Sequence, residues 1–178
     1  MKVILLCAIS LLMSCSKTET ESQVTSPNTD SWFEDVALDW GVNFEYTNGA
    51  EGNFHISEVT GGAPALFDFD NDGDLDLYIV QGLGENGNAL YENRNGTFIN
   101  RSLGSGANDK GYGIGVSTGD YDNDGDTDLY VTNLGVNALL RNDGGGKFTD
   151  VTVHAGVEDD GFSACSAFGD VDMDGDFD

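Results

Sequence analysis

The chain carries three short stretches in which aspartate recurs at every second position around one glycine. They run over residues 68–76, 120–128 and 170–178. Like charges packed this densely repel one another unless a cation neutralises them. Carboxylate oxygens are the ligands that calcium prefers, so each stretch is a candidate calcium site. The candidate ligands are Asp68, Asp70, Asp72, Asp74, Asp76, Asp120, Asp122, Asp124, Asp126, Asp128, Asp170, Asp172, Asp174, Asp176 and Asp178.

The spacing within each stretch predicts a tight coordination loop. Carboxylates at positions 1, 3 and 5 can converge if the chain turns sharply at the glycine in position 6. Position 7 would supply its backbone carbonyl, which leaves the side chains of Asp74, Asp126 and Asp176 facing water. A helix–loop–helix calcium site needs glutamate at position 12, where this chain has Ile79 and Val131. We therefore expect one calcium ion per loop, in three loops between strands; a solvated acidic turn is the alternative for any single copy.

The loops resemble the calcium loops of FG-GAP/VCBS repeats, which form the blades of integrin α-like propellers. Residues 58–63, running into Phe67 and Asp68, are also similar to the start of the bacterial ASPIC/UnbV and cartilage-acidic-protein group. The resemblance covers roughly residues 33–178 and implies a β-propeller with calcium held between the first two strands of each blade. It implies little about activity, because one fold serves many functions.

The repeat unit indicates an all-β fold. Each unit begins with a strand of small residues, continues through the acidic loop into an apolar strand, and ends with two strands joined by a glycine turn. First strands are expected at residues 63–67, 113–118 and 163–168, second at 77–80 and 129–132, third at 89–93 and 138–142, and fourth from Phe98 and Phe148. Four strands in about 50 residues is the period of a propeller blade. This β-propeller fragment has about two and a half four-stranded blades, near residues 62–103, 112–153 and 162–178.

Both ends of the repeat region are incomplete. Residues 33–36 match the start of a fourth strand, and Gly41 correspondingly matches Gly156. We predict that residues 33–36 form the outer strand of a closing blade that this sequence does not contain. The third unit stops inside its acidic loop, and a closed propeller needs at least four blades. We therefore expect a truncated sequence, with a partial propeller over residues 32–178.

One segment departs from the repeat. From Phe33 to the first loop is 35 residues, whereas the matching distance is 22 residues in each of the two later units. The additional residues fall within 43–61 and include His55 and Glu58. They are interpreted as a strap over the propeller; a binding loop on one propeller face is the alternative.

The N-terminus has the features of an export signal. Lys2 precedes an apolar stretch over residues 3–12 that is too short to span a bilayer. The sequence Leu-Met-Ser-Cys at residues 12–15 looks like a bacterial lipobox, which implies cleavage after a signal peptide at residues 1–14 and lipidation of Cys15. An ordinary secretory signal is the alternative. Residues 15–31 are polar and predict a flexible tether. The expected location is the outer membrane or cell surface of a bacterium.

The charge and the residue types present limit which partners and which catalytic sites the chain can have. The formal net charge of −25 argues against nucleic acid as a partner. Cys165 is alone in the mature chain and is predicted to be a small buried residue. No nucleophile motif, histidine-rich metal site or phosphate-binding glycine loop stands out, so an enzyme is not expected within these residues.

Two functions follow from this pattern. The first is a calcium-binding, lipid-anchored module that presents an adhesion or scaffold surface to an extracellular protein or glycan. The alternative is a non-catalytic propeller in a larger secreted, polysaccharide-acting enzyme whose catalytic region lies beyond residue 178.

We predict that Cys15→Ser abolishes lipid labelling and releases the protein from the membrane fraction, because the thiol is the site of acylation. Metabolic labelling with a fatty-acid analogue and fractionation measure both effects. Unchanged fractionation would exclude the lipobox interpretation.

Overall fold

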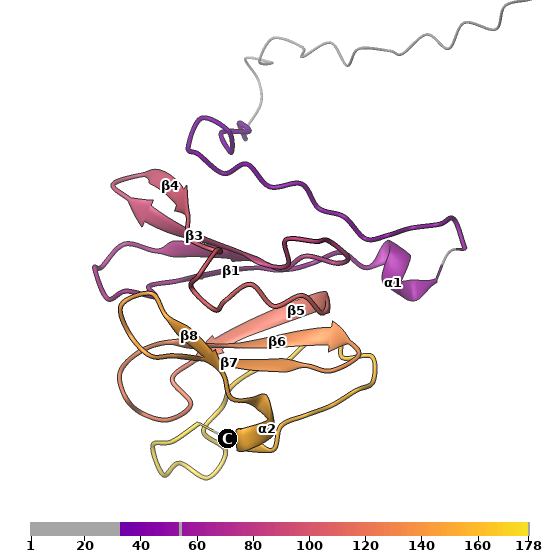
Figure 1. Cartoon of the computed structure of the whole chain (residues 1–178). Coiled ribbons are helices and arrows are strands. Elements are labelled where there is room, and N and C mark those ends of the chain that lie inside the picture. Colours follow the sequence, from indigo (N-terminus) through magenta and orange to yellow (C-terminus); the bar gives the residue numbers. More distant parts are fainter. Residues whose placement is uncertain (1–32, 54, 178) are drawn as a thin grey trace, which may run out of the picture. The chain divides into compact units, whose positions relative to one another are not determined.

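The computed structural model describes residues 33–53 and 55–177 (Figure 1). The chain divides into two compact units, residues 1–35 and 36–178. In the first unit, the described residues 33–35 have no regular secondary structure. The predicted signal peptide, Cys15 and the tether lie outside the described residues. Residues 33–36 form no strand, and their pairing with a closing blade stays a prediction.

Within the described residues, the second unit contains two four-stranded antiparallel sheets. Consecutive strands pair in each sheet, in the orders β1-β2-β3-β4 and β5-β6-β7-β8, which we term blade 1 and blade 2. The bounds are β1 Pro64–Phe67, β2 Asp76–Ile79, β3 Ala89–Arg94, β4 Thr97–Asn100, β5 Tyr112–Gly119, β6 Asp128–Leu134, β7 Ala138–Asn142 and β8 Phe148–Asp150. The mostly β architecture is therefore confirmed, and the sheets are consistent with propeller blades.

Two four-residue helices accompany the sheets in the described part of the chain, α1 (Ile56–Val59) before β1 and α2 (Thr152–Ala155) after β8. In the same part of the chain, neither helix has the length and hydropathy needed to cross a bilayer.

The third repeat differs from its prediction. Residues 163–168 were expected to form a strand, but they form none. This segment contacts blade 2 through a bridge between Leu134 and Phe162 and through hydrogen bonds of Ser163 with Asn133 and Asn137 and of Ser166 with Ser117. In blades 1 and 2 the first strand pairs with the apolar strand after its loop. No such strand follows the third loop in the described residues, so this segment has no ladder to join. Cys165 is consequently exposed, and the prediction that it is buried is wrong.

The two blades share one hydrophobic core. Tyr78, Val80 and Leu90 of blade 1 pack with Leu129 and Val131 of blade 2, and all five are almost fully buried. Continuous apolar second strands supply most of these side chains, because a strand between two stacked sheets is covered on both faces. The stacking of the two sheets is visible in Figure 1.

The small residues of β5 are explained by close neighbours on both sides. A Cβ atom on Gly113 would come within 2.1 Å of Val80 in blade 1. A Cβ atom on Gly115 would come within 3.0 Å of the backbone of Ala164 in the third repeat. At these two positions of β5 a larger side chain would therefore collide with its neighbours.

Two glycines at equivalent positions of the repeat, Gly41 and Gly106, allow the chain to pass close to the fourth strand of a blade. Gly41 (φ 90°) and Gly106 (φ 87°) both have left-handed backbones, and a Cβ atom on either would collide with the carbonyl oxygen of Phe98 or Phe148. The residue before each glycine accepts a hydrogen bond from the N–H of that phenylalanine. Residues 40–41 therefore make the same backbone contact with the fourth strand of blade 1 that residues 105–106 make with the fourth strand of blade 2.

The segment over residues 43–61 is attached to the blades at several points. The Gln81 side chain accepts a hydrogen bond from the Thr47 N–H and donates one to the Glu45 carbonyl. Tyr91 donates to the Asn43 carbonyl, and the Tyr112 hydroxyl lies within hydrogen-bond distance of the carbonyls of Asn48 and Ser57. These contacts from both blades favour the strap interpretation.

A matched pair of tyrosines offers a stability test. The Tyr78 hydroxyl is fully buried, donates to the Ala107 carbonyl and accepts from Asn88, whereas Tyr130 makes the same two bonds to Val157 and Asn137 at a partly exposed site. We predict that Tyr78→Phe lowers the free energy of unfolding by about 1–3 kcal/mol, because its partners are left buried and unpaired. Tyr130→Phe should cost less, since water can replace the hydroxyl. Urea denaturation measures both, and equal losses would contradict this reading.

Candidate metal centres

The acidic loops connect the first strand of each unit to the second. The first follows β1 and leads into β2, and the second follows β5 and leads into β6. In each of these loops the aspartates at positions 1, 3 and 9 each place one oxygen within 4.8 Å of the others. The two triads are Asp68, Asp70 and Asp76, and Asp120, Asp122 and Asp128. In each of the two loops, a stretch of nine residues thus brings three hard oxygen ligands together.

Backbone turns produce this convergence. The carboxylate of Asp68 accepts hydrogen bonds from the N–H groups of Asp72 and Gly73, which folds the loop back on its first residue. Gly73 has φ 94°, as the predicted sharp turn requires. Asn71, at position 4, is also left-handed, with φ 58°. The second loop repeats both the hydrogen bonds from Asp120 and the two positive φ angles.

The aspartate at position 9 is the buried anchor of each loop. The carboxylate of Asp76, which has no solvent exposure, accepts hydrogen bonds from the Phe69 N–H in its own loop and the Asn93 N–H in β3. Asp128 accepts equivalent bonds from Tyr121 and Asn142. Burial raises the pKa of both carboxyls to about 6, although the N–H donors partly oppose this effect.

The aspartates at positions 5 and 7 have other contacts. Asp72 accepts a hydrogen bond from the Asp74 N–H, and Asp124 accepts one from the Asp126 N–H, so each closes a turn outside the triad. The prediction that position-7 side chains face water holds for the exposed Asp74 and Asp176. It is wrong for Asp126, which accepts a hydrogen bond of 2.6 Å from the Asn71 side chain of the preceding loop.

The same contact recurs one unit further along the chain. Asn123 of the second loop donates a hydrogen bond of 2.7 Å to Asp176 of the third loop. Asparagine tolerates the left-handed backbone at position 4, and its side chain reaches the next loop from there. The third loop has Met173 at this position, also with a positive φ. Neighbouring loops are therefore linked in series by asparagine–aspartate hydrogen bonds.

The third loop also forms a triad among the described residues. It brings together Asp170, Asp172 and Asp174, all exposed. Asp170 accepts the N–H groups of Asp174 and Gly175, so the turn itself is the same as in the other loops. Asp178, the predicted ligand at position 9, lies outside the described residues.

Sequence reasoning missed several residues that hold the loops in place. Phe69, at position 2, packs against Phe148 of blade 2 with ring centroids 6.4 Å apart. Asn142 is fully buried and donates to the Phe69 carbonyl across the blade boundary. The repeated asparagine at position 4 was visible as a pattern, but its partner depends on how one blade stacks on the next.

Comparison with protein families matches residues 68–131 and 120–178 to the FG-GAP-like repeat. The chain belongs to the FG-GAP-like repeat family. The two matched stretches begin at the first and second acidic loops and together cover more than half of the chain. A comparison with curated proteins gives no match. The further resemblance to the ASPIC/UnbV group stays a prediction.

The residues of these FG-GAP-like loops fit calcium. Ligands at 2.3–2.6 Å from a calcium ion lie at most about 5 Å apart, and the three oxygens of each triad satisfy that limit. In the first loop, Asp70 Oδ1 is buried without a hydrogen-bond partner among the described residues. A buried carboxylate oxygen in this condition is costly unless a cation binds it. Asp68, Asp70 and Asp76 would hold the ion in the first loop, and Asp120, Asp122 and Asp128 in the second.

We predict that Asp70→Ala removes one calcium ion from the stoichiometry, because it deletes one of three convergent ligands. Asp74→Ala is the matched control: its exposed side chain lies four residues away in the same FG-GAP-like loop and outside the triad. Isothermal titration calorimetry counts the ions. Full stoichiometry in Asp70→Ala, or an equal loss in both variants, would show that the ligand assignment is wrong.

The buried anchors also predict a pH dependence. In the folded protein the pKa of Asp76 and Asp128 is about 6, above the value of about 3.9 expected in an unfolded chain. The folded state therefore binds more protons between these values, and stability in calcium-free buffer should rise as the pH falls from 7 to 5. With calcium present, stability should instead fall as the pH falls from 7 to 5, because protons compete with the ion for the carboxylates. Urea midpoints measure this, and the variant Asp76→Asn with Asp128→Asn should flatten the calcium-free profile.

Proposed function

We propose that the chain is a calcium-stabilised binding or scaffold module, exported and held to a membrane through lipidated Cys15, with an extracellular protein or glycan as its partner. The observation that carries the proposal is the repeated convergence of three carboxylates at the junction between the first two strands of a blade. Membership of the FG-GAP-like repeat family supports calcium as the ion. The export signal and tether are the sequence support for the location.

The role we propose for calcium is structural. Asp76 connects the first loop to β3 through the Asn93 N–H, so a charge change in the loop acts directly on the sheet. Carboxylate oxygens of Asp68, Asp70 and Asp76 lie within 4.8 Å of one another, so their negative charges repel when no cation is bound. A calcium ion would offset this repulsion and fix the loop between strands.

A binding role is favoured over catalysis within these residues. The described groups with raised carboxyl pKa values, Asp70, Asp76, Asp122 and Asp128, all belong to the acidic loops, where calcium coordination accounts for them. The formal net charge of −25 also favours an extracellular protein or glycan over nucleic acid as the partner, because an acidic surface repels phosphates. The alternative, a propeller within a polysaccharide-acting enzyme, rests on the sequence alone.

The proposed function predicts a specific calcium titration. After removal of divalent ions, calorimetry should show saturable calcium binding, with two sites of similar affinity for the first two loops, because their triads use the same three positions. Magnesium should bind less well, since it requires a smaller octahedral site. Thermal denaturation should show a higher midpoint with calcium. Absence of saturable calcium binding would contradict the proposal.

A further inference from the structure

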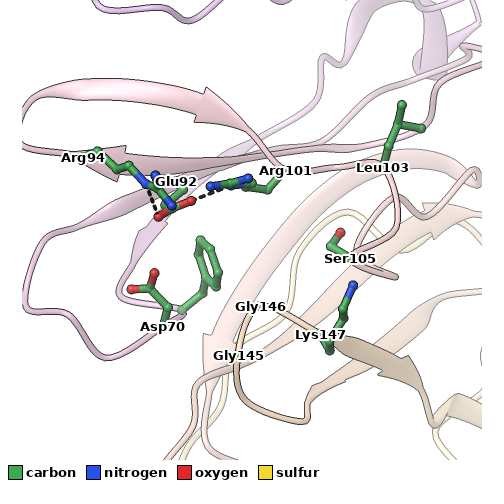
Figure 2. Close-up of a pocket in the computed structure, with 10 residues that line it drawn as sticks. Asp70, Glu92, Arg94, Arg101, Leu103, Ser105, Gly145, Gly146 and Lys147 are labelled. Atoms are coloured by element: carbon green, nitrogen blue, oxygen red, sulfur yellow. Dashed lines mark hydrogen bonds and ion pairs between the residues drawn. The ribbon is translucent and has the colours of Figure 1, made fainter.

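A cavity of about 390 Å³ lies beside the first loop, between blade 1 and the turn that joins β7 to β8 (Figure 2). Blade 1 supplies Glu92 and Arg94 from β3, Arg101 from just after β4, and Asp70 from the acidic loop. Lys147 reaches it from the turn in blade 2. The repeat pattern gave no indication of this site, because residues from two different units form it.

The cavity gathers the positive charge of an acidic chain. The sequence has 7 lysines and arginines against 32 acidic residues. Two of the seven, Lys2 and Lys17, lie outside the described residues, which leaves five. Three of these five line the cavity, opposed by Glu92 and Asp70, so the lining carries a net charge of about one positive unit.

Glu92 holds the two guanidinium groups in place. Its side chain is 10% exposed and accepts hydrogen bonds from Nε of both Arg94 and Arg101, which converge on it in Figure 2. These ion pairs lower the pKa of Glu92, so it stays ionised. In the described part of the chain neither guanidinium makes a further hydrogen bond through its terminal nitrogens. Each therefore keeps a planar pair of donors for an outside acceptor.

The remaining cation is also available. Lys147 Nζ donates one hydrogen bond, of 2.6 Å, to the Gly104 carbonyl, which is neutral. Its positive charge therefore has no ion-pair partner among the described residues, and an ammonium group has further donors. Arg141 differs, because Asp143 already neutralises it at 2.6 Å.

This arrangement selects one class of ligand. Guanidinium donors in a fixed plane recognise carboxylates and similar oxyanions in paired hydrogen bonds. One net positive charge matches a single anionic group, while the surrounding negative surface repels polyanions. The volume is at the lower end for small-molecule sites, and the lining is mainly polar, which suits hydroxyl groups better than apolar side chains.

We propose that this cavity binds the carboxylate of an acidic sugar, such as a uronate at the end of a glycan chain. The proposal rests on the proposed function of a binding module and assigns a ligand class to it. Arg94 and Arg101 contact the carboxylate, Lys147 adds its positive charge from the other side of the cavity, and Glu92 is a positioning residue.

The test is a titration of the calcium-saturated protein with glucuronate, followed by NMR or calorimetry. Glucose, which has the same ring without the charge, is the matched ligand control. Arg101→Gln should weaken glucuronate binding about tenfold or more, because a charge-assisted hydrogen bond is lost while Arg94 still pairs with Glu92. Arg141→Gln, outside the cavity, should leave it unchanged. Lys147→Met should likewise weaken glucuronate binding, whereas Lys110→Met, outside the cavity, should leave it unchanged.

The outcomes separate this inference from the proposed function. Equal binding of glucose and glucuronate, no binding of glucuronate, or equal weakening by Arg101→Gln and Arg141→Gln overturns the inference. Tighter binding of a short peptide through its C-terminal carboxylate overturns the sugar assignment in favour of a peptide. Calcium binding is measured separately on the same protein. Calcium binding without glucuronate binding overturns only the cavity, whereas glucuronate binding without calcium binding overturns only the calcium module.

Discussion

The structure depends on burying one carboxylate per blade beside other carboxylates. Asp76 and Asp128 have no solvent exposure, and each connects its loop to the third strand of its blade through backbone N–H groups. Burial and neighbouring charges both disfavour the ionised form, as the raised pKa values show. The fold thus places charge where only a cation or a proton can relieve it. This constraint makes the acidic loops part of the blade framework.

The same loops connect one blade to the next. Asn71 contacts Asp126, Asn123 contacts Asp176, and the ring of Phe69 packs on Phe148 of blade 2. Asn142 adds a buried hydrogen bond to the backbone of Phe69. Polar contacts on the exposed side and aromatic packing beneath them therefore hold adjacent loops in a fixed relation. A change in one loop can reach its neighbour by these contacts.

Local pattern explains how much the sequence could predict. The period-two aspartates, the glycine in position 6 and the continuous apolar strands each act within a few residues, so the loops and the strands of both blades followed from them. Contacts between units did not. The partner of Asn71, the role of Phe69 and the cavity around Glu92 all require knowledge of how blades stack. Residues 163–168 failed as a strand for a related reason, since a strand requires a partner as well as a propensity.

The most direct test of the account is amide hydrogen exchange at Phe69 and Asn93, the two N–H groups that Asp76 holds. Exchange should be measured by NMR with and without calcium, with the Leu90 amide of the same strand, which donates to the Ser102 hydroxyl, as the internal reference. If calcium stabilises the blade through its loop, protection at Phe69 and Asn93 should rise on calcium binding by more than at Leu90. Unchanged protection at both amides in protein shown to be calcium-bound would contradict a structural role for the ion.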